Sequence, residues 1–179
     1  MGQNKTLNNF LQKINYDNGV YTIIVEPSKY NQTCSELAAF CNKKFKLPGI
    51  YVSLNKPSTF VEKMLKKEKI DTENILFIDW EDKSIDKDNH VTLSSKSLTE
   101  VSIAISGVCN YTDMKYILLD SLNILLIYNP LVKVQKFVQF LINKARNLEV
   151  LMFLIIVKEK NADNLIPTLI EFSDKSIEI

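Results

Sequence analysis

Unbroken apolar runs restrict the fold of this chain more than any other feature. Residues 151–157 read LMFLIIV, and residues 20–25 and 116–119 are of the same kind. A strand that is apolar on both faces must be covered on both faces, as in parallel sheets flanked by helices. Segments with the apolar spacing of helices separate these runs. The alternation predicts a three-layer α/β/α fold with a mostly parallel central sheet.

The expected elements follow from this alternation. Strands are expected at residues 20–25, 50–54, 74–78, 115–120, 150–157 and 176–179. Helices are expected to begin near Thr33, Ser58, Ser97 and Pro130, with a short helix near 163–172. Residues 1–19 are expected to form an N-terminal helix or arm, and the polar residues 80–96 a surface excursion. We expect residues 1–179 to form a single domain with a real core.

Composition excludes several classes of function. The net charge of +1, from 22 basic and 21 acidic residues, does not favour nucleic acid or an anionic membrane as a partner. The longest apolar run, residues 150–157, is far shorter than the roughly 20 residues of a membrane-spanning helix. The three cysteines and one histidine show no metal-ligand spacing. A cytoplasmic protein with free thiols and no bound metal is expected.

The stretch VYTIIVEPSKYNQTCSE, residues 20–36, has the order of strand, loop and helix start found at phosphate-binding loops. Such a loop needs G-x-x-x-x-G-K-[ST], because glycines let backbone N–H groups approach phosphate and the lysine neutralises it. Aligned on Thr33, the glycine positions hold Glu26 and Asn31, and the lysine position holds Gln32. Thr33 alone fits the pattern.

The order of elements resembles the RecA-like ATPases of the KaiC type, which act in archaea as signalling and motility ATPases. Four stretches carry the resemblance: NGVYTIIVEPSKYNQTCSELAAFC, GIYVSLNKPSTFVEKM, KYILLDSLNILL, and LEVLMFLIIVKE followed by LIEFSDKSIEI. In turn they are similar to that family's opening strand with P-loop and helix, its second strand, its Walker B strand, and its late strand with closing hairpin. The resemblance covers roughly residues 18–179.

The resemblance implies a role for particular positions. The Walker A lysine falls on Gln32, and the magnesium-binding hydroxyl falls on Thr33. The Walker B carboxylate falls on Asp120, which is followed by Ser121. The catalytic glutamate falls on Asn55, whose amide cannot act as a general base. We therefore expect no catalytic residues and no cofactor, with nucleotide binding no better than weak in a vestigial pocket formed by Asn31, Gln32, Thr33, Asp120 and Ser121.

Structural roles also account for the retained residues. Thr33-x-x-Glu36 is a capping-box pattern, and we prefer N-capping to magnesium binding for Thr33. For Asp120 we prefer a cap of the loop that follows its strand. Cys34, near a helix N-terminus, would have a lowered thiol pKa if it were reactive. No histidine or second cysteine stands beside it in the sequence, so a structural thiol is expected.

The sequence therefore predicts an inactive KaiC-like homologue that acts as a regulatory or scaffolding module, of the kind used in signal transduction. Its partner would be a protein, either an active RecA-like paralogue or a second copy of the chain, bound through residues 80–96 or the sheet edge. The alternative is a non-hydrolysing sensor that binds a nucleotide or another small anion at the altered loop. An enzyme of different chemistry lacks support, because no Ser-His-Asp set is visible and His90 lies in the polar excursion.

Overall fold

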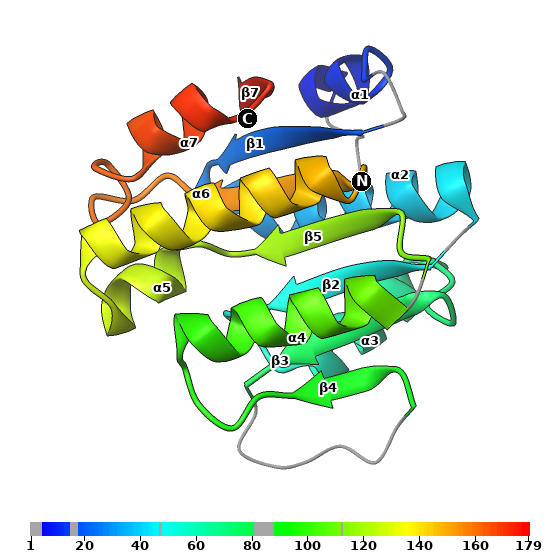
Figure 1. Cartoon of the computed structure of the whole chain (residues 1–179). Coiled ribbons are helices and arrows are strands. Elements are labelled where there is room, and N and C mark those ends of the chain that lie inside the picture. The colour runs from blue at the N-terminus through cyan, green and yellow to red at the C-terminus, as the bar shows by residue number, and fades with distance from the viewer. Residues whose placement is uncertain (1–4, 15–17, 47, 81–87, 112) are drawn as a thin grey trace.

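The sheet at the centre of the molecule is parallel throughout (Figure 1). The computed structural model describes residues 5–14, 18–46, 48–80, 88–111 and 113–179. Its seven strands follow the order β4-β3-β2-β5-β6-β1-β7, and each pairing between them is parallel. Their bounds are β1 Gly19–Val25, β2 Gly49–Ser53, β3 Ile75–Asp79, β4 His90–Thr92, β5 Tyr116–Asp120, β6 Leu151–Val157 and β7 Lys175–Glu178.

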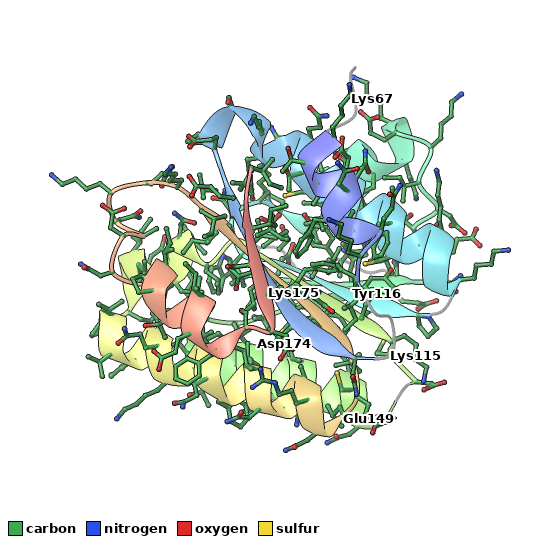
Figure 2. The ribbon with its side chains drawn as sticks, turned by 90° about the horizontal axis from the view of Figure 1, so that it is seen from above. Lys67, Lys115, Tyr116, Glu149, Asp174 and Lys175 are labelled. Carbon is green, nitrogen blue, oxygen red and sulfur yellow. The ribbon has the colours of Figure 1, made fainter. Side chains whose placement is uncertain are left out.

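Helices cover both faces of this sheet, which confirms the predicted three layers (Figure 2). One face carries α1 (Lys5–Leu11), α2 (Tyr30–Phe45) and α3 (Ser58–Lys67). The other face carries α4 (Leu98–Tyr111), α5 (Asn123–Tyr128), α6 (Leu131–Asn147) and α7 (Ile166–Phe172). Successive strand residues alternate between the two cores. Tyr51 and Leu118 pack in the α2 layer, and Val52 and Leu119 pack in the α6 layer. This alternation explains why the strands are apolar on both faces.

Two described elements differ from the expected ones. Strand β4 lies inside the segment 80–96 that was expected to be a surface excursion, while residues 81–87 of that segment lie outside the described residues. Helix α5 follows β5 directly and was not expected. Both elements are short, and a three-residue strand gives too few positions for an alternation to be recognised.

The expected closing hairpin is wrong. Strands β6 and β7 lie on opposite sides of β1, and both run parallel to it. Helix α7 connects them, and a crossover through a helix returns the chain in the parallel direction, whereas a hairpin needs only a tight turn. The backbone N–H of Glu26 donates to the carbonyl of Ile179 at 2.9 Å, so the end of β7 is fixed beside the loop that follows β1.

The strand order sets the position of the candidate site. Strand β6 lies between β1 and β5, and all three run in the same direction. The loop after β1 and Asp120 at the end of β5 therefore lie at the same edge of the sheet. In parallel α/β sheets, ligand sites form outside this carboxyl edge.

Candidate functional site

The connection after β1 is short. Glu26 is the one residue between β1 and a 3-10 turn, Pro27–Lys29, which continues directly into α2 at Tyr30. Pro27 suits this place, because its φ is fixed near the helical value and its missing N–H is not needed in a first turn. The chain thus enters a helix within two residues of the strand, with no extended loop of consecutive backbone N–H groups.

This early start overturns the expected role of Thr33. Helix α2 begins one turn earlier than expected, with Lys29 at its N-cap and no side-chain capping bond. Thr33 lies inside the helix, is fully buried, and its Oγ1 makes no hydrogen bond within the described structure. The capping-box prediction is therefore wrong, because the 3-10 turn supplies the first turn that a cap would otherwise stabilise.

Asp120, at the end of β5, binds two tyrosines. Its Oδ1 accepts a hydrogen bond from the hydroxyl of Tyr30 at 2.5 Å, and its Oδ2 accepts one from the hydroxyl of Tyr51 at 2.6 Å. The side chain is 2% exposed. The expected capping of the following loop is wrong, since the carboxylate points to these phenols. We call Asp120, Tyr30, Tyr51 and the adjacent thiol of Cys34 the Asp120 cluster.

Burial controls the protonation of the Asp120 cluster. It raises the pKa of the Asp120 carboxyl above its ordinary value, against the hydrogen bonds from Tyr30 and Tyr51 and the charge of Lys56, which lower it. Burial, followed by the charge of Asp120, raises the pKa of both tyrosines and of Cys34. The phenols therefore stay protonated as donors, and Cys34 is a buried thiol, as expected, without the lowered pKa of a reactive one.

Lys56 places a positive charge beside this cluster. Its Nζ donates a hydrogen bond to Oδ1 of Asn31 and lies 4.5 Å from the centre of the Tyr30 ring. Asn55, next to it, is exposed, and its Nδ2 is 3.5 Å from the Tyr30 hydroxyl, a long contact. Asn31 and Asn55 are thus both exposed and lie near Tyr30, at the surface of the site.

The expected pocket residues Gln32 and Ser121 are not part of the Asp120 cluster. The Nε2 of Gln32 donates to Oε1 of Glu36 at 2.8 Å, one turn further along α2. Ser121 is buried beside Asp120 and begins the connection to α5. The structure thus brings Asp120 together with Tyr30 and Tyr51, which the sequence did not single out, and directs Gln32 away from them.

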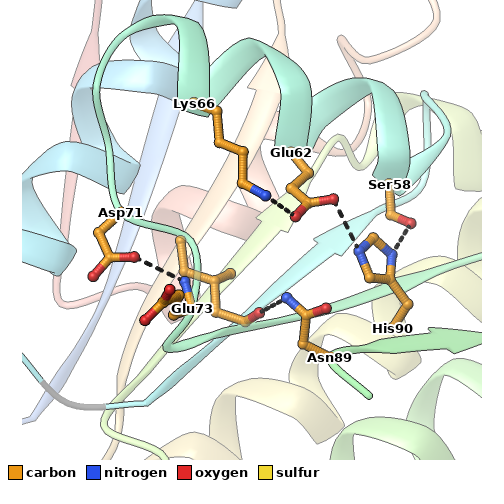
Figure 3. A network of polar contacts seen from close by, with 8 residues as sticks. Ser58, Glu62, Lys66, Asp71, Glu73, Asn89 and His90 are labelled. Carbon is orange, nitrogen blue, oxygen red and sulfur yellow. Dashed lines mark hydrogen bonds and ion pairs between the residues drawn. The ribbon is translucent and has the colours of Figure 1, made fainter. Parts of the chain in front are cut away.

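A second buried polar cluster was missed altogether (Figure 3). Oγ of Ser58 lies 2.7 Å from Nδ1 of His90, and Nε2 of His90 lies 3.4 Å from Oε2 of Glu62 without forming a hydrogen bond. The backbone N–H of Ser58 donates to Oδ2 of Asp79 at 2.6 Å. We call Ser58, Glu62, Asp79 and His90 the Ser58 cluster. His90 is in β4, and its ring stacks on Phe77 at 5.1 Å.

The Ser58 cluster brings together the residue types of a nucleophilic triad, which were not recognisable as a set in the sequence. Its burial argues against that chemistry. Ser58 is 1% exposed, and the side chain of His90 is also 1% exposed, so a substrate carbonyl has no approach to Oγ. The cluster instead joins the first turn of α3 to the edge strand β4. Ser58 and Glu62 are four residues apart, so the sequence alone could have placed them on one helix face. Nothing in the sequence indicated that His90 would lie beside them.

Two kinds of feature were not found among the described residues, namely a metal-binding group and a membrane-spanning helix. Among them, no three His, Cys, Asp or Glu side chains are grouped so as to hold a metal ion. Within the same residues, no helix has the length and apolar character needed to cross a membrane.

Comparisons with known proteins identify relatives of the fold. No family model matches the chain, and no curated protein matches its sequence. The KaiC-like protein PH0186 from the hyperthermophilic archaeon Pyrococcus horikoshii OT3 aligns with a TM-score of 0.66 and 10% identity, over 89% of this chain and 70% of that one. A second protein of Pyrococcus horikoshii OT3, PH0250, aligns with a TM-score of 0.62 and 18% identity, over 96% and 86% of the two chains. At such identities the likeness establishes the fold alone.

Proposed function

We propose that this chain, which has the RecA-like fold of KaiC-like proteins, is a catalytically inactive homologue that works as a regulatory or scaffolding protein-interaction module, with signal transduction as its setting. The observation that carries the proposal is the engagement of both Asp120 oxygens by the hydroxyls of Tyr30 and Tyr51. Each phenol occupies one acceptor site on a carboxylate oxygen, which leaves fewer lone pairs of Asp120 for a divalent cation. Magnesium binding at Asp120 would compete with these two hydrogen bonds.

The loop after β1 supports the same proposal. A single residue, Glu26, precedes the 3-10 turn, so no run of backbone N–H groups is free to surround a phosphate. Gln32, at the position that the resemblance assigns to the Walker A lysine, carries no charge and bonds to Glu36. Phosphoryl transfer depends on positioning and charge stabilisation, and loss of one stabilising group typically costs on the order of 3 kcal/mol in the transition state. Several such groups are missing together.

The residue at the position of the water-activating glutamate also supports the proposed inactivity. Asn55 is exposed, and its nearest polar contact in the described structure is the Tyr30 hydroxyl at 3.5 Å. A neutral amide does not accept a proton near neutral pH, so it cannot activate water as a general base.

Phosphate release from ATP with magnesium tests the inactivity. We expect the purified chain to release no more phosphate than a Thr33→Ala, Asp120→Asn variant, because neither residue contacts nucleotide in the proposed state. Tyr30→Phe is a useful third protein in this assay, since it lacks one of the two hydroxyls that donate to Asp120. Release by the unaltered chain above the double variant would refute the inactive assignment.

Light scattering after size exclusion tests the interaction role. We expect the full chain to form a defined complex, either with itself or with an active RecA-like ATPase mixed with it at micromolar concentration. A chain that stays monomeric and binds neither would count against a scaffolding function, whatever the outcome of the phosphate assay.

The sensor hypothesis has one observation in its favour, namely Lys56 beside the exposed Asn31 at the mouth of the loop. A thermal melt with ATP, ADP or inorganic phosphate separates the two proposals. No rise in melting temperature is expected for the interaction module. A rise that Lys56→Ala abolishes would favour the sensor instead.

A further inference from the structure

The groove between α4 and α6 is the surface that we assign to the partner: we propose that it binds an amphipathic helix with acidic flanks, contributed by another protein. This inference rests on the proposed interaction function and specifies its site. The groove has a volume of about 620 Å³ and is lined by the first turns of α4 and the first half of α6. Both helices lie on the same face of the sheet (Figure 1). This groove is a different surface from residues 80–96 and from the sheet edges, which were expected from the sequence to bind the partner.

The floor and walls of the groove expose apolar side chains. Phe137, 6% exposed, lies at its base, while Ile103 of α4 is 65% exposed and Phe140 of α6 is 49% exposed. Leu98, on the first turn of α4, also lines the groove and is half-buried. Exposed large apolar residues scattered singly are ordinary, but several around one hollow mark an interaction site.

The charge of the groove is positive. Lys133 and Lys136 line it, both are exposed, and neither forms an ion pair within the described part of the chain. Helix α6 contains no acidic residue along its whole length. The one acidic residue of α4, Glu100, accepts hydrogen bonds from Ser94 and Ser95 at 2.8 and 2.9 Å. The groove thus carries a local excess of positive charge, whereas the chain as a whole has a net charge of only +1.

These features select the occupant. An apolar floor with cationic walls complements a helix that has apolar residues at i, i+3, i+4 and i+7 and carboxylates beside them. The lined part of α6, from Lys133 to Phe140, is roughly 11 Å long at 1.5 Å per residue, the length of about two turns of a partner helix. A hollow of this shape suits an inserted helix better than a lipid surface, which needs apolar residues on a convex face.

Selection from a phage library of random peptides of about 16 residues, roughly four helical turns, provides the test with the full chain as bait. We expect the enriched peptides to be acidic and to carry apolar residues at helical spacing. Enriched peptides that are basic, or that lack this spacing, would overturn the proposal.

Matched variants locate the binding site of the selected peptides. Lys133→Glu with Lys136→Glu, or Phe140→Ser alone, should weaken peptide binding by about tenfold or more, the usual effect of losing a central contact. The controls make the same chemical changes on the opposite face, at Lys63 with Lys67 and at Phe60, which is 54% exposed. These controls should leave the affinity unchanged. Equal losses in both sets would overturn the proposal.

Other occupants give different results. Binding to phosphatidylserine vesicles that Lys133→Glu with Lys136→Glu abolishes, without selection of acidic helices, would replace the peptide by a membrane surface. Self-association that the same variant abolishes, without peptide selection, would replace it by a second copy of the chain. Selected peptides that bind the controls and the groove variants alike would refute this site but leave the interaction function intact. The phosphate assay tests the inactivity separately.

Discussion

Asp79 and Asp120 occupy equivalent positions at the ends of two strands but have different structural roles. Each is the last residue of a strand, β3 and β5, and each is buried, at 1% and 2% exposure. Asp79 accepts the backbone N–H of Ser58 at the start of α3, the helix that precedes β3 in the chain, and so satisfies a donor of the first helical turn. Asp120 accepts two side-chain hydroxyls, from Tyr30 and Tyr51, which only this particular sequence supplies. The difference teaches that a carboxylate at a strand end can be a structural cap or the centre of a specific side-chain cluster.

The surroundings of the two clusters differ in charge as well. In the Ser58 cluster, Glu62 pairs with Lys66 at 2.7 Å and approaches His90. In the Asp120 cluster the donors are neutral phenols. Each region also contains one buried polar atom without a hydrogen bond in the described structure, Nε2 of His90 and Oγ1 of Thr33. We expect the largest loss of stability from removal of the His90 ring, which packs on Phe77, and a pH dependence of stability from the buried carboxyl of Asp120.

The largest effect is expected from His90→Ala. It removes the contact with Ser58 and the stack on Phe77 and leaves a cavity, so the free energy of unfolding should fall by about 3 kcal/mol. Urea denaturation measures this. His90→Phe keeps a ring against Phe77 and should lose less. A loss as large in His90→Phe as in His90→Ala would show that the polar contact, and not the packing, dominates.

Tyr51→Phe should follow in size. It leaves Oδ2 of the buried Asp120 without its donor, and a hydrogen bond to a charged group contributes about 2 kcal/mol. Urea denaturation of this variant should show a loss of that order. Tyr128→Phe removes a hydroxyl at the surface, where Lys96 donates to it, and should change stability little. Equal effects of the two variants would deny that the Asp120 cluster is a buried network.

The pH dependence of stability sharpens the contrast further. Burial raises the pKa of Asp120 in the folded state above its ordinary value of 3.8, so the folded chain holds this proton more tightly than the unfolded chain. Stability from this group is therefore fully present below pH 3.8 and is lost as the pH rises through the folded-state pKa. The unaltered chain should lose stability relative to Asp120→Asn between acid and neutral pH. Urea denaturation of both chains across this range measures the difference, and a constant difference would contradict the prediction.

The smallest effect is expected from Thr33→Val, and it should be favourable. The valine has nearly the same shape and removes a buried hydroxyl that lacks a hydrogen bond, so stability should rise by about 1 kcal/mol. Thr22→Val is the matched control, because Thr22 is equally buried but its Oγ1 lies 2.6 Å from Oγ of Ser173. The control should be destabilised. A loss of stability in both variants, measured by thermal melts, would contradict the prediction, since the Thr33 hydroxyl would then stabilise the fold as the Thr22 hydroxyl does.

The sequence predicted the layers and most strands well, because a run such as residues 151–157 can be satisfied only between two helical layers. It placed Asp120 correctly at the end of its strand. It missed the partners, since Tyr30 stood in an apparent loop and Tyr51 read as an ordinary strand residue. Contacts across strands depend on register, which a single sequence does not display. For the same reason His90 was taken for a surface residue, although β4 brings it against α3.

The parallel pairing of β1 with both β6 and β7 has a consequence for biosynthesis. Of the described strands, β1 is the first to leave the ribosome, and its two neighbours are the last. Because synthesis proceeds at roughly 5–20 residues per second, both edges of this apolar strand stay unpaired for several seconds after the strand is made. Contacts between segments so distant in the chain also slow folding. The nascent chain should therefore depend on chaperones until β7 closes the sheet.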